Sequence, residues 1–256
     1  MDIFKANILL ILRLTKTLIK IYKYKIRHFF VTIQLSQDDD SAISKGVKLI
    51  PLLNKAVKDA YELKIKANPR KKDSVFLNTF PGEHYRLLGG LVKNINAKVI
   101  IDIGTFTGMS SRVFLDNTSQ DAIVHTFDII EWQKFDSHLK KIEFKKGKIN
   151  QHISDLSQKK EFKKYLKLIS ISDLIFLDAP KDGNFEYRFL NLLSGVKLER
   201  KSRLLIIDDI KFLNMLSLWR SIKSPKIDAT SFGHWSGTGI VDISNGLELN
   251  KKFFNN

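Results

Sequence analysis

The sequence contains no cysteine, so a disulfide framework and a thiolate metal site are both excluded. This absence fits a reducing compartment, and we expect a cytoplasmic protein. Long uncharged runs are lacking too: those at residues 6–12 and 29–37 are too short to span a bilayer. No small-x-small cleavage site follows a long apolar core, so the sequence predicts no signal peptide.

Acidic residues are few compared with basic ones. The 256 residues include 43 Lys and Arg against 27 Asp and Glu, a formal net charge of +16. Such a charge can attract a polyanion or an anionic membrane surface. The basic residues are spread over several segments, among them 64–72, 140–148 and 159–167. A solvated basic surface therefore accounts for most of the charge, and a nucleic-acid partner is not favoured.

The first 34 residues differ from the rest of the chain. Basic side chains recur there at spacings of three and four residues: Arg13, Lys16, Lys20, Lys23 and Arg27. Apolar residues fall on another side, so the pattern predicts a basic amphipathic helix within residues 1–36. This helix either contacts an anionic membrane surface through residues 1–34 or packs on the rest of the protein or on a second subunit. Residues 37–75 are predicted to form a helical cap or linker ahead of a domain at 76–256.

The most informative stretch is Val99–Ser110, which combines β-branched residues, an acid and two glycines. It predicts a buried parallel strand, a tight turn at Gly104 and the first turn of a helix, with backbone N–H groups open to a ligand. A second strand at 123–127 ends in Asp128, where a carboxylate can accept hydrogen bonds from both hydroxyls of a ribose. Gly104 and Gly108 have Gly-x-x-x-Gly spacing, which disfavours a nicotinamide dinucleotide and favours S-adenosylmethionine.

Strands and helices alternate along most of the chain. We expect strands at 98–103, 122–127, around 141–145, 174–177, 204–207, 227–232 and 238–243. Helices are expected at 109–117, 158–167, 184–195 and 211–222. Alternation of this kind predicts the α/β class, with a Rossmann-like, doubly wound, mostly parallel sheet and added N-terminal helices. The last two strands predict an antiparallel edge.

Acidic residues follow two neighbouring strands of this sheet. Asp178 ends the strand at 174–177, and Asp208 and Asp209 end the strand at 204–207. Ligands of open α/β sheets bind beyond the carboxyl ends of the strands, so we expect the three carboxylates to lie side by side. An all-oxygen set suits Mg²⁺ or a similar divalent cation. Each acid taken alone can instead cap a helix.

Lys181 lies three residues beyond Asp178, within reach of the same pocket. A lysine near a divalent cation gives up its proton more readily, and so does a metal-bound hydroxyl. Together these effects would produce an oxygen nucleophile aimed at the methyl group of the cofactor. Lys181 is therefore the candidate catalytic base, with an ordinary surface lysine as the alternative.

These motifs resemble those of the cation-dependent class I O-methyltransferases, typified by catechol and caffeoyl-CoA O-methyltransferases. The resemblance covers about residues 80–243 and is carried by 101–110, 125–128, 176–182 and 205–210. It implies a set of residues that bind S-adenosylmethionine: Asp102, Gly104, Thr105, Phe106, Gly108, Ser110, Asp128, Ile129, Ser154, Asp155 and Asp178. It further implies Asp178, Asp208 and Asp209 as metal ligands and Lys181 as the base. Asp209 stands where the family has asparagine, which keeps an oxygen donor and adds a negative charge.

Four residues outside these motifs lie near the expected site. Glu83 and His84 precede the helix that leads into the first strand, and either approach the cofactor or are buried or capping residues. His234 and Trp235 lie in the connection between the last two strands, and either border the acceptor pocket or pack a turn.

The expected function is methyl transfer from S-adenosylmethionine to a hydroxyl of a small molecule, assisted by Mg²⁺ or another divalent cation. One alternative is a metal-independent methyltransferase acting on RNA, protein or a glycan or lipid-linked acceptor. Another is a non-catalytic nucleoside-binding module, and a third is a nicotinamide oxidoreductase. Related enzymes are often dimers, so a homodimer is included among the expected partners.

Overall fold

The computed structural model describes residues 37–68, 70–78, 84–197, 199, 202–212, 214–233 and 235–250. The amphipathic helix predicted within residues 1–36 lies outside the described residues, as do Glu83 and His234. Across the described ranges, every helix falls short of the length and apolar character that crossing a bilayer requires.

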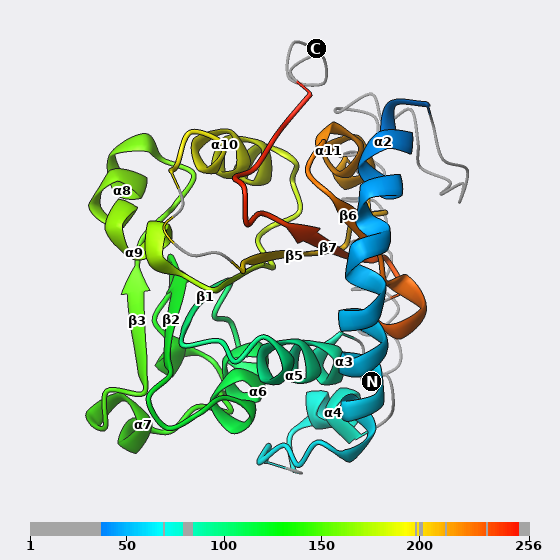
Figure 1. The fold of residues 1–256 in the computed structure, drawn as a ribbon. Coiled ribbons are helices and arrows are strands. Elements are labelled where there is room, and N and C mark those ends of the chain that lie inside the picture. Colours follow the sequence, from blue (N-terminus) through cyan, green and yellow to red (C-terminus); the bar gives the residue numbers. More distant parts are fainter. Residues whose placement is uncertain are drawn as a thin grey trace, which may run out of the picture.

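The described residues form a seven-stranded sheet with the order β3-β2-β1-β4-β5-β7-β6 (Figure 1). The strands are β1 Val99–Ile103, β2 Ile123–Asp128, β3 Ile149–Ile153, β4 Leu174–Leu177, β5 Leu204–Asp208, β6 Lys226–Asp228 and β7 Thr238–Asp242. Strands β1 to β5 pair in parallel, whereas β7 runs antiparallel to both β5 and β6. The predicted parallel sheet with an antiparallel edge is confirmed.

Helices lie between most of the strands and ahead of the first. They are α2 Gln37–Gly46, α3 Ile50–Glu62, α4 Val75–Asn78, α5 Tyr85–Asn94, α6 Met109–Asn117, α7 Lys141–Lys145, α8 Lys159–Lys164, α9 Leu166–Ile171, α10 Asn184–Leu193 and α11 Met215–Ser221. Figure 1 shows α5 and α6 on one side of the sheet and α10 on the other. The sheet is therefore the middle layer of three.

The two faces of the sheet are both buried, because successive strand residues point to opposite sides. Ile100 of β1 packs with residues of α3, α5 and α6, such as Val113. The next residue, Ile101, packs in the other core with residues of α8 to α11, such as Phe189. Apolar runs such as Leu174–Leu177 are buried throughout, as a strand covered on both faces requires. The doubly wound class expected from the sequence is confirmed.

The strand predicted around 141–145 is wrong, because this segment is helix α7. The side chain of Glu143 accepts a hydrogen bond from the backbone N–H of Lys140 at 2.9 Å, a contact that starts a helix. The strand of this region is β3, at 149–153. It pairs with β2 alone, and its middle residues 150–152 are polar, so it lacks the apolar run of the central strands.

Other element boundaries also differ from the prediction. The single helix expected at 158–167 divides at Tyr165 into α8 and α9. The strand expected at 227–232 is reduced to β6, and a 3₁₀ turn at Thr230–Phe232 follows it. Asp228 accepts a hydrogen bond from the backbone N–H of Thr230 at 2.9 Å, which favours a turn over a continued strand.

The turn after β1 depends on a glycine. Gly104 has φ +106°, and a Cβ at this position would lie 2.1 Å from the carbonyl oxygen of Asp178 after β4. Its N–H donates to the carbonyl of Phe127 in β2 at 2.9 Å. The carboxyl ends of three adjacent strands therefore meet at Gly104, with no room for a side chain.

Replacing Gly104 with alanine is expected to lower the free energy of unfolding by about 2 to 5 kcal/mol, since both the backbone conformation and the contact with Asp178 are strained. Gly147→Ala is the matched control, because Gly147 also has a positive φ (+66°) but nothing within 4 Å of an added Cβ. Gly147→Ala should lower the free energy of unfolding by about 1 to 2 kcal/mol. Urea unfolding measures both variants, and equal losses would contradict the crowding at Gly104.

Candidate active site

A pocket of about 580 Å³ opens at the carboxyl ends of the parallel strands. Its lining includes a group of the residues predicted to bind the cofactor: Gly104, Phe106, Asp128, Ile129, Ser154, Asp155 and Asp178. They come from the segments after β1, β2, β3 and β4, which lie far apart in the sequence. The parallel sheet brings them together because these strands all end at the same edge.

The Asp128 carboxylate is held in a fixed orientation at this pocket. One of its oxygens accepts a hydrogen bond from the backbone N–H of Phe106 at 3.0 Å, and the other accepts from the N–H of Ile130 at 3.0 Å. Each carboxylate oxygen has two lone pairs, so acceptor capacity remains on the pocket side. Asp128 can therefore accept hydrogen bonds from vicinal hydroxyls of a bound nucleoside.

Other predicted cofactor residues lie behind the turn and outside the lining. Asp102 is fully buried and accepts a hydrogen bond from the Ser110 hydroxyl at 2.8 Å. Burial raises the pKa of Asp102 to about 7. The Thr105 hydroxyl shares a 2.7 Å hydrogen bond with Thr126. These side chains hold the turn against the strands, so it is the backbone groups of these residues that can contact a ligand.

Gly108 also lies behind the turn, at the start of α6. It has φ +74°, and a Cβ there would lie 2.5 Å from the Leu139 side chain. A side chain at this position would therefore displace Leu139, which packs against the turn.

Ser154 and Asp155 form the part of the lining that follows β3. The Ser154 hydroxyl donates to Glu161 at 2.9 Å, and Asp155 accepts from the backbone N–H of Ser157 at 2.9 Å. Asp155 thus starts the turn that leads into α8. Ser154 and Asp155 therefore line the pocket and also hold the turn that precedes α8.

Asp178, Asp208 and Asp209 lie side by side at the ends of β4 and β5, as the sequence predicts. The Nζ atom of Lys181 lies between them: it forms an ion pair with Asp178 and lies 3.4 Å from Asp208 and 3.0 Å from Asp209. Burial opposes the charge of Lys181, but the three carboxylates outweigh this effect and raise the pKa of the lysine above its ordinary value. The cluster is therefore neutralised in part by Lys181.

The loop that carries Lys181 is held by a residue that the sequence analysis missed. Glu186 of α10 is fully buried and accepts hydrogen bonds from the backbone N–H groups of Lys181 at 2.8 Å and Gly183 at 3.0 Å. Lys181 itself has φ +58°, a conformation that few side chains adopt without support. A glutamate three residues into a helix is the only sequence signal for this role.

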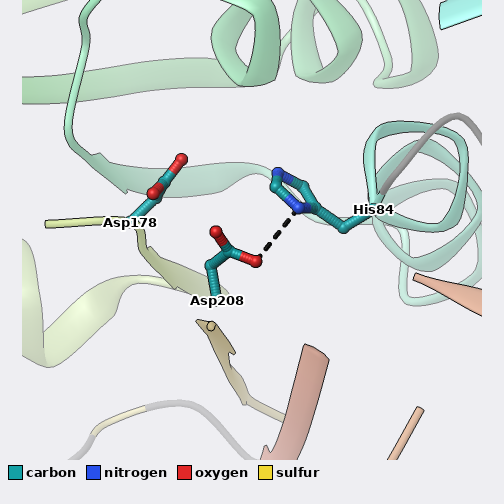
Figure 2. Close-up of side chains that lie close together, drawn as sticks. All are labelled: His84, Asp178 and Asp208. Carbon is teal, nitrogen blue, oxygen red and sulfur yellow. Dashed lines mark ion pairs between the residues drawn. The ribbon is translucent and has the colours of Figure 1, made fainter. Parts of the chain in front are cut away.

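His84, from the segment before α5, also lies at the acid cluster. It is 2 % exposed, directly precedes α5, and places Nδ1 3.1 Å from an oxygen of Asp208. Figure 2 shows His84, Asp178 and Asp208 converging on one space, and each offers a ligand atom within 4.8 Å of the others. Two carboxylates and an imidazole at this spacing fit a divalent cation.

Asp209 is engaged differently from the other two acids. Its carboxylate accepts a hydrogen bond from the Ser236 hydroxyl as well as pairing with Lys181. Trp235, the residue before Ser236, is 78 % exposed. Trp235 therefore lies in the segment that contacts the acid cluster, with its ring accessible to a ligand.

The model of the O-methyltransferase family matches residues 64–218. A probable caffeoyl-CoA O-methyltransferase 3 from Dictyostelium discoideum is 31% identical over 172 residues, which cover 61% of this chain and 65% of that protein. The chain thus matches just under two thirds of the length of this curated relative. A solved methyltransferase from Geobacter sulfurreducens aligns with a TM-score of 0.42 and 16% identity, over 77% of this chain and 89% of the other. Since the family model spans more than half of the sequence, from the segment before α5 to α11, the chain belongs to the O-methyltransferase family, whose members use S-adenosylmethionine.

Proposed function

We propose that this protein transfers the methyl group of S-adenosylmethionine to a hydroxyl oxygen of a small molecule, with the help of a divalent cation. One observation carries the proposal: Asp178 lines the pocket and also belongs to the acid cluster. A cofactor in the pocket and an acceptor at the cluster would therefore meet at Asp178. Methyl transfer needs this proximity, because the donor carbon and the attacking oxygen must be in line.

The pocket suits an adenosyl sulfonium. Asp128 can receive the ribose hydroxyls, and the Gly104 turn allows close approach of the methionine end. The side chains of Phe106 and Ile129 are 61% and 71% exposed and offer apolar surface for the adenine ring. Ser154 and Asp155 supply polar atoms at the end of β3. The positive sulfonium would lie near the Asp178 carboxylate, where opposite charges attract.

The carboxylates of Asp178, Asp208 and Asp209 form the predicted cation site. What the cation would supply when bound is a lower pKa for the acceptor hydroxyl and a fixed orientation of its oxygen. Asp178 and Asp208 orient this site from two adjacent strands, so their spacing is fixed by the sheet. Nζ of Lys181 lies 3.4 Å from Asp208 and 3.0 Å from Asp209, so its amine is beside this site.

Lys181 is proposed as the base. The proton of the acceptor hydroxyl passes to Nζ of Lys181 as the oxygen attacks the methyl carbon and the C–S bond breaks. The products are a methyl ether and S-adenosylhomocysteine. For this step the amine must be neutral, so Lys181 must first release a proton to solvent, which a cation bound to its carboxylate partners would favour. Glu186 keeps the loop in place while the amine changes partners.

Replacing Asp128 with asparagine is expected to weaken S-adenosylmethionine binding about 10- to 100-fold, because the ribose hydroxyls lose a charged acceptor. Asp121→Asn, in an exposed ion pair with Lys98 ahead of β2, is the matched control and should bind normally. Isothermal titration calorimetry with the cofactor measures both. Unchanged affinity of the Asp128 variant would refute the assignment of the ribose site.

Lys181→Met is expected to lower the rate of S-adenosylhomocysteine formation about 10²- to 10⁴-fold, as loss of a general base does, while cofactor affinity stays the same. Lys164→Met is the control, because Lys164 also pairs with an acid three residues away but lies on the surface. The assay uses hydroxylated small molecules, with catechol and caffeoyl-CoA among them. Equal rates for both variants would exclude Lys181 as the base, and no methylation of any acceptor would count against a small-molecule substrate.

A further inference from the structure

We infer that His84, together with Asp178 and Asp208, holds the cation, and that this mixed nitrogen and oxygen set selects a transition-metal ion such as Co²⁺ or Zn²⁺ over Mg²⁺. The inference rests on the proposed function, in which a cation lies at the acid cluster. It replaces the third predicted ligand, Asp209, with a histidine from a different part of the chain.

The geometry of the three side chains is that of a ligand set. One atom from each of His84, Asp178 and Asp208 lies within 4.8 Å of the other two, a separation that donors around one ion can have. The residues come from the start of α5 and from the ends of β4 and β5. Figure 2 shows the imidazole and both carboxylates facing the space between them.

The imidazole is held rigidly in this position. His84 is 2 % exposed, and its ring lies against Phe176 at a centroid distance of 5.1 Å and Tyr85 at 4.3 Å. Asp208 is also buried. A ligand set that is fixed before binding and largely shielded from water favours an ion that releases its water easily, whereas Mg²⁺ gives up its water reluctantly.

Asp209 has another role in this arrangement. Its carboxylate accepts a hydrogen bond from Ser236 and pairs with Lys181, and it is not part of the group that gathers within 4.8 Å among the described residues. It therefore acts on Lys181 and leaves the third ligand position to His84. The ligand charge becomes −2 with a neutral imidazole, which balances a divalent ion, compared with −3 for three carboxylates.

The chemistry of the donors then decides the metal. Carboxylate, carbonyl and water ligands suit Mg²⁺, whereas imidazole nitrogen suits zinc, copper, iron and nickel. Most sites with nitrogen and oxygen ligands bind late transition-metal ions more tightly than Mg²⁺. A higher affinity of the wild type for Co²⁺ or Zn²⁺ than for Mg²⁺ is therefore not diagnostic of a histidine ligand. The diagnostic quantity is how much of that preference depends on the His84 ring.

The test is calorimetric titration of the full chain and of His84→Asn with Co²⁺, Zn²⁺ and Mg²⁺. Asparagine keeps an oxygen donor, so the ratio of Co²⁺ to Mg²⁺ affinity should fall at least about 10-fold while Mg²⁺ affinity is retained. His152→Ala is the control for unspecific binding, because His152 is half-buried and stacks on His125 away from the cluster. An affinity ratio unchanged by His84→Asn would overturn the inference.

A second measurement avoids dependence on the folding of a variant. The Co²⁺-loaded wild type should show a strongly shifted, solvent-exchangeable imidazole N–H resonance in the proton spectrum, and absence of such a resonance would also overturn the inference. If wild type and His84→Asn both bind cations with the same ratio of Co²⁺ to Mg²⁺ affinity, only the role of His84 fails. If no cation binds to the wild type, the cation in the proposed function fails as well.

Discussion

Three carboxylates at the ends of two adjacent strands repel one another, and the structure of this site follows from the need for positive charge between them. Lys181 supplies that charge in the structure, with its amine among Asp178, Asp208 and Asp209. Placing the amine there requires a left-handed backbone at Lys181, which the buried Glu186 stabilises through two N–H groups. Charge balance thus explains both the conformation of this loop and the acid buried in α10.

The parallel sheet determines which functional groups meet. Strand β1 lies between β2 and β4, so the turn at Gly104 touches the ends of both neighbours. The side towards β2 carries Asp128 and the pocket, and the side towards β4 and β5 carries the acid cluster. Asp178 belongs to both sides. In the proposed reaction, the methyl donor and the acceptor would bind separately and still react, because the two sites share one strand end.

Much of this arrangement could be predicted from the sequence. Local patterns identified the central strands, the Gly104 turn, and the acids after β2, β4 and β5, since each depends on a few consecutive residues and the rules for parallel sheets. The helix at 141–145 and the strand at 149–153 were missed because amphipathic segments this short do not separate the two periodicities. The place of His84 and the bond from Ser236 to Asp209 depend on how distant segments pack, which no local pattern records.

The central claim is that Asp178 is shared by a cofactor pocket and a cation site. Its most direct test is calorimetric titration of wild type and Asp178→Ala with S-adenosylmethionine, each with and without a divalent cation. We predict that the wild type binds the cation and that the bound cation changes its affinity for S-adenosylmethionine. Asp178→Ala should lose cation binding, so its affinity for S-adenosylmethionine should be the same with and without the cation. Cation affinity that is the same in Asp178→Ala and wild type would contradict it.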